Sequence, residues 1–393
     1  MPELRFPAFL DAPEWQKKPL DDLISTVTPP KKIVTTDYLD KGEFPIIDQG
    51  QSDIAGWTND PASLIKNDLP LIVFGDHTCA LKLVNQPFAQ GADGIKVIKA
   101  NYLLTTEYLY QFLRCKPVVT EEYKRHFSIL KTKTIAYPEN KSGEQQKITD
   151  CLSAIDDLIS AQTKKIEALN AHKKGLMQRL FPAEGETVPR LRFPEFRNAN
   201  GWKETHIGSQ LRQVVRPIEM NDDVDYSLVT VKRRYGGIET RGVFKGRAIK
   251  VKSQFLIKEN DFLISKRQIV HSACGVVPRV LENFIVSNEY SVLAATPKCD
   301  INFFWYFAQQ PKVSESFLAS SRGIVIEKML FDLEYWLKRK FMFPLLSEQR
   351  EIGNLLISID DLIVAHAGKL DTLKAHKKGL MQGLFPSTSE GEA

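Results

Sequence analysis

A segment of 39 residues occurs twice in this chain. Residues 144–182 and residues 348–386 align without a gap at an offset of 204, and 23 of the 39 aligned positions are identical. Two unrelated helices of similar composition would not match so closely in one register, so the pattern indicates an internal duplication. Each copy ends at Phe-Pro, and proline cannot continue a helix. The chain is therefore expected to contain two equivalent long helices.

Apolar residues recur in both copies at spacings that alternate between four and three. This heptad pattern is typical of the narrow seam of a coiled coil rather than of the wider apolar face of a globular helix. A polar residue interrupts the seam at the same two points of each copy, Gln162 with His366 and Lys173 with Lys377. Matching interruptions favour one register if the two helices pair with each other. The apolar seam positions are Ile148, Leu152, Ile155, Ile159, Ile166, Leu169, Ile352, Leu356, Ile359, Ile363, Leu370 and Leu373.

A shorter repeat precedes each globular part of the chain. Residues 2–15 match residues 189–202 at an offset of 187, and both contain Leu-Arg-Phe-Pro-x-Phe followed by Trp. Because the offset grows from 187 to 204, the second globular region is 17 residues longer than the first. The duplicated unit is thus a lead-in, a globular region and a long helix. Each lead-in is expected to pack its Phe and Trp side chains against the domain behind it.

The two globular regions have diverged in sequence, and both are expected to be mixed α and β. Short apolar segments bounded by Gly, Pro and Asp predict the strands. In the first region we expect strands at 46–47, 71–74, 78–84, 94–98 and 129–136, and a helix at 107–115. In the second we expect strands at 226–231, 247–252, 262–265, 275–277, 284–287, 291–295 and 337–343, and a helix at 302–309.

Composition sets broad limits on the class of protein. A chain of 393 residues allows two or three domains, and a net charge of +5 allows a nucleic-acid partner without requiring one. The five cysteines are far apart and form no CxxC pair, which argues against a zinc site or a disulfide framework. The start of the chain does not resemble a signal peptide, and no apolar run could span a membrane. A cytoplasmic location is therefore expected.

The sequence lacks the usual catalytic motifs. There is no phosphate loop, no GxGxxG, no HExxH and no GxSxG. There is also no Asn-Pro-Pro-aromatic motif of an adenine methyltransferase and no Pro-Asp dipeptide of the common nuclease pattern. His172 and His376 lie beside lysines near the helix ends, where the helix dipole favours cations. We therefore assign no catalytic residues and no metal ligands.

Basic residues gather in residues 232–252, which hold eight Lys or Arg and one acidic residue. Glycines and an aromatic residue interrupt the charges, so a hairpin with loops is expected, and DNA binding is favoured over a merely solvated hairpin. The candidates in the second region are Lys232, Arg233, Arg234, Tyr235, Arg241, Lys245, Arg247, Lys266, Arg267, Gln268 and Arg322. In the first region a base-reading loop and a plain Asp- and Thr-stabilised turn are equally good readings. The candidates there are Asp76, His77, Thr78, Lys82, Gln90 and Lys96.

The duplicated helices carry a resemblance to a known family. Both open on Glu-Gln-x-x-Ile, contain IDDLI at 155–159 and 359–363, and close on AHKKGLMQxLFP at 171–182 and 375–386. The whole arrangement resembles the specificity subunit of a type I restriction-modification system. The helices are the specific part of this resemblance, and it extends over the whole chain in order and length. The first copy departs from it by lacking the Pro-Leu-Leu-Ser that precedes the second.

The resemblance implies an α+β fold with a pseudo-two-fold internal repeat. Two target recognition domains, at 1–143 and 183–347, would each read one half of a split DNA sequence. The helices at 144–182 and 348–386 would form an antiparallel coiled coil that separates them, and 387–393 would be a polar tail. Two methylation subunits would bind the helices, and restriction and translocation subunits would join through those. S-adenosylmethionine, ATP and magnesium would belong to the partners, so the chain itself would carry no cofactor.

Two other functions remain open from the sequence. A self-contained DNA-modifying or DNA-cutting enzyme is disfavoured by the missing motifs, and methyl transfer by the purified chain alone would favour it again. A coiled-coil adaptor whose two modules bind proteins is the other alternative. It predicts that reversing the charges of Lys232, Arg233 and Arg234 leaves DNA association unchanged.

Overall fold

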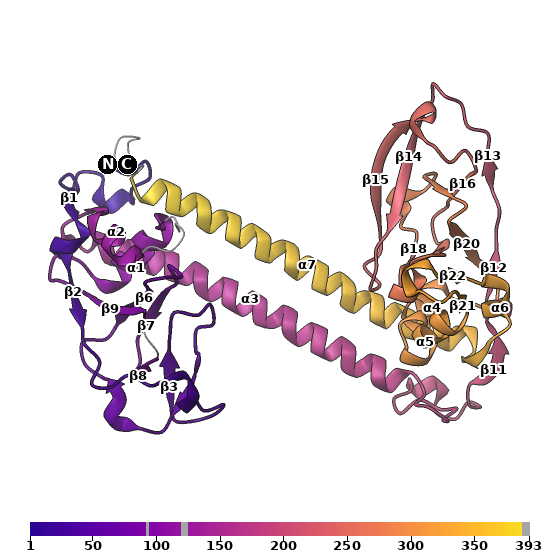
Figure 1. Cartoon of the computed structure of the whole chain (residues 1–393), viewed down its shortest axis with the longest axis horizontal. Coiled ribbons are helices and arrows are strands. Elements are labelled where there is room, and N and C mark those ends of the chain that lie inside the picture. The colour runs from indigo at the N-terminus through magenta and orange to yellow at the C-terminus, as the bar shows by residue number, and fades with distance from the viewer. Residues whose placement is uncertain (92–93, 119–124, 387–393) are drawn as a thin grey trace. The chain divides into compact units, whose positions relative to one another are not determined.

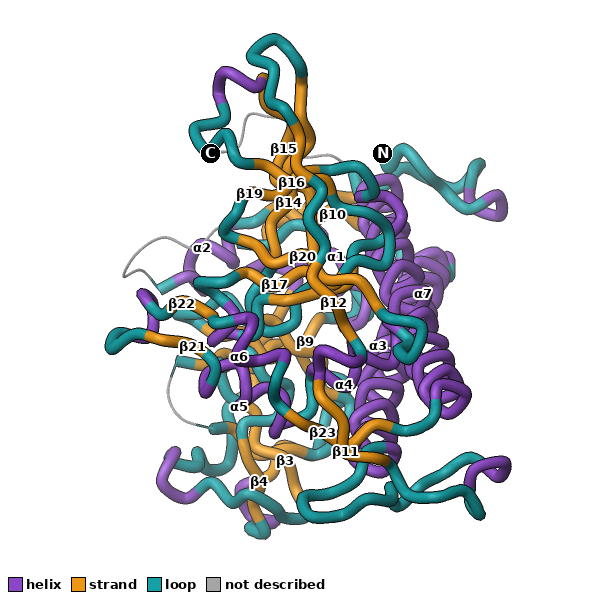
Figure 2. Tube along the Cα trace, turned by 90° about the vertical axis from the view of Figure 1, so that its right-hand side faces the viewer, coloured by secondary structure: helices purple, strands orange, loops and turns teal. Residues whose placement is uncertain are grey.

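The computed structural model describes residues 1–91, 94–118 and 125–386. The polar tail expected at 387–393 lies outside these residues. The chain divides into two compact units, one formed by Met1–Lys164 with Ala367–Ala393 and the other by Lys165–His366. Figure 1 labels many of the elements of both units, and Figure 2 colours helices, strands and loops differently. Each unit contains one globular domain and one end of each long helix.

The first unit consists of small sheets and short helices. Its strands are β1 (Gln16–Pro19), β2 (Ile24–Val27), β3 (Phe44–Ile47), β4 (Gly56–Thr58), β5 (Leu64–Ile65), β6 (Leu71–Gly75), β7 (Leu81–Val84), β8 (Phe88–Gln90), β9 (Ile95–Ala100) and β10 (Thr134–Tyr137). Its short helices are α1 (Thr106–Cys115) and α2 (His126–Thr132). The sheets have the orders β2-β9-β6-β7, β4-β3-β8-β5 and β1-β10.

Strand β6 and helix α1 form the centre of the first domain. Strand β6 is buried along its whole length, because it lies inside its sheet and α1 packs against it. Thr105 begins α1 by accepting a hydrogen bond from the backbone N–H of Tyr108. The helix turns Leu109, Phe112 and Leu113 inward, as its sequence predicts.

The second unit has the longer hairpin and the larger aromatic core. Its strands are β11 (Lys203–His206), β12 (Leu211–Gln213), β13 (Pro217–Ile218), β14 (Asp225–Val231), β15 (Ile238–Lys245), β16 (Gln254–Leu256), β17 (Phe262–Ser265), β18 (Cys274–Val276), β19 (Ile285–Ser287), β20 (Tyr290–Ala295), β21 (Ser321–Arg322), β22 (Leu330–Phe331) and β23 (Lys340–Phe343). Its short helices are α4 (Ile301–Ala308), α5 (Pro311–Ala319) and α6 (Leu333–Leu337). The main sheets have the orders β13-β16-β19-β14-β15 and β12-β20-β17-β18, and β11 pairs with β23.

The strand predicted at 129–136 is wrong over its first half. Residues 129–132 belong to α2, and β10 begins at Thr134. The Asp76 carboxylate accepts a hydrogen bond from the backbone N–H of Phe127 at 2.8 Å. This bond satisfies a donor in the first turn of α2 and so favours a helix there.

The strand predicted at 247–252 is also wrong. These residues form a short 3-10 turn and a loop, and the strand of the basic segment is β15. The last strand, β23, begins at Lys340 because the preceding residues form α6. Periodicity could not separate these alternatives, since short segments with only three or four apolar residues fit a strand and a turn equally well.

The long helices are α3 (Glu144–Leu180) and α7 (Leu346–Leu384). Every apolar seam position predicted from the heptads is buried or half-buried. In the first unit, Lys377 near the end of α7 binds Asp156 of α3 at 2.5 Å. In the second unit, Lys173 near the end of α3 binds Asp360 of α7 at 2.7 Å. Because the two pairs are related by the duplication and run in opposite senses, the predicted antiparallel pairing and its pseudo-two-fold repeat are confirmed within the units.

The duplicated lysine interruptions of the seam, Lys173 and Lys377, therefore have a structural role. Burial alone would raise the pKa of Asp156, but the hydrogen bond from Lys377 and the charges of Arg114 and Lys377 outweigh it, so its pKa is lowered. Tyr306 of α4 donates a further hydrogen bond to Asp360 at 2.6 Å. Each ion pair thus joins the two helices and also touches the domain of its own unit.

The arginine of each lead-in clamps the start of a long helix. Arg5 binds both carboxylate oxygens of Glu144 at 2.8 Å, and Arg192 binds those of Glu348 at 2.7 and 2.8 Å. Both pairs are almost fully buried, with side-chain exposures of 7% and 0% in the first and 6% and 1% in the second. Bidentate Arg–carboxylate pairs have one preferred geometry, so each clamp fixes its lead-in on the helix.

The end of each long helix enters an aromatic core. Phe385, after α7, packs edge-on against Phe112 in the first unit with ring centroids 5.4 Å apart. Phe181, after α3, stacks on Phe303 in the second unit at 5.5 Å and meets Trp202 of the lead-in at 5.9 Å. The Phe-Pro that closes each helix therefore anchors it in the domain that does not precede it in the chain.

Candidate nucleic-acid interface

Two loops of the second unit bring most of its predicted DNA-binding residues together. The tip of the β14–β15 hairpin, residues 232–237, lies against the loop 266–273 between β17 and β18. The backbone N–H of Arg234 donates to the carbonyl of His271 at 2.8 Å, and that of Tyr235 donates to Ser272 at 3.0 Å. Residues that are about 35 positions apart in sequence thus form one surface.

Arg233 and Arg234 are the best-placed cations of this surface. Both side chains are exposed, and within the described part of the chain neither forms an ion pair. Arg233 donates a hydrogen bond to the side-chain oxygen of Gln268 at 2.7 Å. Exposed guanidinium groups can bind phosphate or read guanine edges through two hydrogen bonds. We refer to Lys232, Arg233, Arg234, Lys266, Arg267 and Gln268 as the basic loop surface.

Some cations of this region already have acidic or carbonyl partners. Lys232 pairs with Glu239 at 2.6 Å, and Arg267 pairs with Glu289 at 2.7 Å. Lys266 donates to the carbonyl of Asn288 at 2.7 Å. The two ion pairs are about half exposed, and such pairs contribute only about 0–1 kcal/mol. Phosphate could therefore replace the acid at little cost. Arg322, on β21, is likewise exposed and pairs with Asp332.

Tyr235 holds the hairpin tip in place. Its hydroxyl donates to the carbonyl of Ala308 at 3.0 Å, and its ring meets Trp305 edge-on at 6.0 Å. Burial raises the pKa of this phenol, so it remains a donor. Arg234 and Tyr235 both have left-handed backbone conformations, with φ of 56° and 55°. Tyr235 therefore stabilises the conformation of the hairpin tip, and its hydroxyl is used in a hydrogen bond within the protein.

The remaining basic residues of the hairpin lie away from the basic loop surface. Lys245 ends β15, and seven residue steps of about 3.3 Å place it roughly 23 Å along the strand from Ile238. Both cations there form ion pairs. Lys245 Nζ lies 3.7 Å from Asp225 Oδ1, and Arg247 Nη1 lies 3.5 Å from Asp223 Oδ1. The far end of the hairpin is thus mixed in charge. Arg241, between the two ends, lines a separate cavity.

Three candidates of the first unit are buried structural residues. The Asp76 carboxylate is bound to Phe127, as described above, and Gln90 is 3% exposed within β8. Lys82 is 8% exposed and donates to the carbonyls of Asp48 and Ser52 at 2.9 and 2.5 Å. Burial lowers the pKa of Lys82, although the nearby charges of Asp48 and Asp53 oppose this. These three side chains stabilise the domain interior.

The other candidates of the first unit reach solvent. His77 and Thr78 are exposed in the turn between β6 and β7, and the Thr78 hydroxyl donates to the carbonyl of Gln49 at 2.6 Å. Lys96 is exposed on β9 and lies 5.6 Å from the centroid of the Phe127 ring. His77 and Lys96 are thus the candidates of this unit whose polar groups remain available to a ligand.

The described residues offer few sites for other chemistry. They contain no group of three or more His, Cys, Asp or Glu side chains placed to hold a metal ion. The five cysteines are free, and burial raises the pKa of Cys274 and Cys299, so these two thiols are unreactive. No helix in the described part of the chain is long and apolar enough to cross a membrane.

Known proteins share this sequence pattern and fold. The family described as type I restriction modification DNA specificity domain matches twice, at residues 13–171 and 216–375. The type I restriction enzyme MjaVIII specificity subunit of Methanocaldococcus jannaschii is 22% identical over 405 residues, covering 95% of this chain and 92% of that protein. The provisionally named MjaX specificity subunit of the same organism is 26% identical over 254 residues, covering 62% of this chain and 56% of that protein.

One solved structure has the same fold over nearly its whole length. The type I restriction-modification system S subunit from M. genitalium has a TM-score of 0.67 at 15% identity and covers 99% of this chain and 100% of its own. At this low sequence identity, the likeness between the two structures shows a shared fold and no more. The family match covers most of the chain and repeats at the interval of the duplicated helices. The chain therefore belongs to the type I restriction-modification DNA specificity family, and it is a DNA target-recognition subunit.

Proposed function

We propose that the two domains of this chain each read one half of a split DNA sequence. The observation that supports this proposal most directly is that the contacts of the long helices are duplicated, whereas the sequences of the two domains have diverged. Arg5 with Glu144 and Arg192 with Glu348 are equivalent clamps, as are the two interhelical Lys–Asp pairs. Two equivalent long helices that carry two different domains suit a DNA target whose two halves differ in sequence. A fixed support also requires a fixed spacing between half-sites, as in dimeric DNA-binding proteins.

Phosphate and base contacts would come from different parts of each domain surface. In the second domain, Arg233 and Arg234 are exposed cations that can approach the DNA backbone or guanine edges without first leaving an acidic partner. In the first domain, His77 and Lys96 have the equivalent freedom. The buried clamps would hold these surfaces steady while DNA binds.

The chemistry of methylation and restriction would belong to partner subunits. We propose that this chain is non-catalytic and binds two methylation subunits, through which restriction and translocation subunits join. S-adenosylmethionine, ATP and magnesium would be bound by those partners. The target adenine would be turned out of the duplex into a methylation subunit, since a base within the stack cannot be reached.

Deleting the gene should remove one methylation motif from the genome. We would map methylated adenines in the source cells with the gene, without it, and with it restored. The expected result is complete loss of one gapped, two-part motif on deletion and its return on restoration. An unchanged pattern in cells that express the partner subunits would contradict the proposed function and favour the protein-binding adaptor.

Removing two charges from the basic loop surface should weaken DNA binding. In the double variant Arg233→Gln, Arg234→Gln, the negative slope of log affinity against log salt should become shallower by about 0.9 for each phosphate contact that is lost. Duplex binding would be measured by fluorescence anisotropy between about 50 and 200 mM salt. The matched control is Lys258→Gln with Arg279→Gln, two exposed cations of the same unit outside this surface. Equal slopes for both variants would exclude the basic loop surface from the interface.

A further inference from the structure

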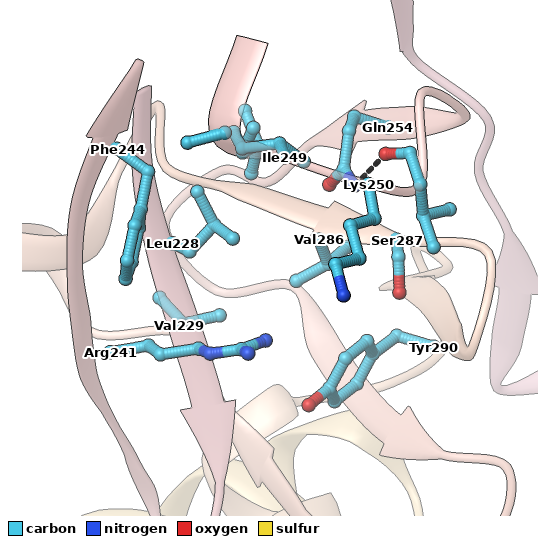
Figure 3. Close-up of a pocket in the computed structure, with 13 residues that line it drawn as sticks. Leu228, Val229, Arg241, Phe244, Ile249, Lys250, Gln254, Val286, Ser287 and Tyr290 are labelled. Carbon is cyan, nitrogen blue, oxygen red and sulfur yellow. Dashed lines mark hydrogen bonds between the residues drawn. The ribbon is translucent and has the colours of Figure 1, made fainter. Parts of the chain in front are cut away.

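A cavity of about 360 Å³ lies on one face of the five-stranded sheet in the second unit. Its walls come from β14, β15, β16 and β19, from Tyr290 at the start of β20, and from the loop 248–251. Figure 3 shows Arg241, Lys250 and Tyr290 directing their polar ends toward a common space. Ligand cavities in proteins are about 300–1,000 Å³, so this one suits a small ligand.

A β-bulge directs two side chains of β15 into this cavity. Leu228 of β14 faces Gly242 while Val229 faces Thr240, so Arg241 is an extra residue in its strand. Arg241 and Phe244 are three residues apart and would point to opposite faces of a regular strand. The extra residue lets both line the cavity, and Gly242 accommodates the bulge with a φ of 136°. Bulges often redirect side chains at binding sites.

Like Arg233 and Arg234, the two cations of the cavity have no acidic partner within the described residues, although most cations of this segment do. Lys232, Lys245, Arg247 and Lys252 on the same hairpin segment each pair with an acidic residue. Within the described residues, no ion pair or hydrogen bond engages the side chain of Arg241 or Lys250. Both are exposed residues that point into one space (Figure 3), and two cations without a counter-charge favour an anion between them.

The other walls suit a planar ring with polar edges. Phe244 and Tyr290 lie on opposite sides of the cavity (Figure 3), and Val229, Ile249 and Val286 form apolar parts of the lining. Gln254 is 3% exposed, and its side-chain nitrogen donates to the carbonyl of Val251 at 2.7 Å. Its side-chain oxygen accepts no hydrogen bond within the described part of the chain. A buried acceptor without a donor is costly, and a ligand that brings an N–H group would relieve it.

We propose that this cavity binds a single nucleotide, with its phosphate on Arg241 and Lys250 and its ring against Phe244 and Tyr290. Arginine binds phosphate through two hydrogen bonds, and aromatic side chains stack on every base. An amino group of the base would donate to Gln254. The nucleotide is either free or part of bound DNA and turned out of the duplex, and the second source rests on the proposed function.

The probe for this site is 2-aminopurine deoxyribonucleoside 5′-monophosphate, whose fluorescence is quenched by stacking. Titration with the full chain should give saturable quenching. Arg241→Gln with Lys250→Gln should weaken binding at least about tenfold, because two charged hydrogen-bond donors are lost. Phe244→Leu should reduce the quenching, and the nucleoside without phosphate should bind as weakly as the double variant. Lys258→Gln with Arg279→Gln is the control of equal charge and should bind like the unaltered chain.

Competition identifies the source of the nucleotide. If a duplex containing the target displaces the probe, the site takes a nucleotide of the DNA; if both bind together, it takes a free nucleotide. Equal probe binding by the unaltered chain and the Arg241→Gln, Lys250→Gln variant would overturn the proposal. If the free probe does not bind, 2-aminopurine is placed at each target position in turn. A 2-aminopurine that leaves the duplex for the cavity should stay quenched in the unaltered chain and brighten in the Phe244→Leu variant, which lacks one stacking partner. A duplex in which no position behaves in this way would also overturn the proposal.

The Arg233→Gln, Arg234→Gln variant separates this proposal from the proposed function. The probe should bind that variant normally, because those residues lie outside the cavity. Loss of duplex binding with probe binding retained would show that the two sites act independently. Normal duplex binding by every variant, with the probe still bound, would contradict only the assignment of the basic loop surface.

Discussion

Replacing Glu348 by alanine is expected to lower the free energy of unfolding of the second unit by about 3–5 kcal/mol. The substitution leaves Arg192 buried without its partner, and its side chain is only 6% exposed. The hydrogen bonds that Arg192 donates to Glu348 raise the pKa of the guanidinium, and the variant loses them. Arginine is nevertheless not deprotonated in proteins, so Arg192 stays charged without its partner. A buried charge that has lost its counter-ion costs far more than an exposed one.

The measurement is thermal and urea unfolding followed by intrinsic fluorescence. For a unit of about 200 residues the change corresponds to roughly 6–20 °C in the unfolding midpoint. Glu351→Ala is the matched control, because this residue is exposed on the same helix and should change stability by less than about 0.5 kcal/mol. Equal midpoints for the two variants would mean that the clamp does not support the fold.

Replacing Ile359 by aspartate should destabilise the second unit by about 3–5 kcal/mol at neutral pH. Ile359 is 6% exposed in the seam and packs in the main apolar core of this unit. An aspartate there loses the apolar contacts and buries a charge without a partner. Burial would raise its pKa in the folded state above the unfolded value of about 3.9. The added loss is therefore absent below about pH 4 and grows as the pH rises through the folded pKa.

The duplication supplies an unusually close control for this variant. Leu362→Asp makes a similar change three residues later on the same helix, where the side chain is 50% exposed. Ile155→Asp and Leu158→Asp form the equivalent pair in the first unit, at 8% and 55% exposure. The buried positions should lose stability with the stated pH dependence, whereas the exposed ones should change by less than about 0.5 kcal/mol. Similar losses at 359 and 362 would contradict the assignment of the seam.

The repeat explains why the helices could be predicted so well. Because the heptad pattern occurs in two copies, the seam assigned in one copy could be checked against the other. A seam residue such as Ile155 is buried like its counterpart Ile359 because the sequence around both is similar. The Arg of the lead-in and the Glu of the helix start were also visible in both copies. Their pairing was not predicted, since two separate repeats of different offset gave no reason to join Arg5 to Glu144.

The candidate site could be predicted only in part. Arg233 and Arg234 were found because charge concentrates along the sequence there. Asp76, Lys82 and Gln90 looked equally polar, yet the fold buries all three. Lys250 lay in the basic segment but was not singled out, and Gln254 and Tyr290 carried no signal of their own. Only the sheet order brings those residues beside Arg241.

The sequence by itself determined the duplicated helices, their seam, and the family. The helices and their seam depend on neighbours three and four residues away, which the chain order specifies directly, and the family follows from the motifs that these helices carry. The tertiary structure alone decided which polar side chains are exposed, which arginine clamps which helix, and that a bulge at Arg241 opens a cavity. These depend on contacts between residues far apart in the chain, where burial and the available partners fix the cost of each charge.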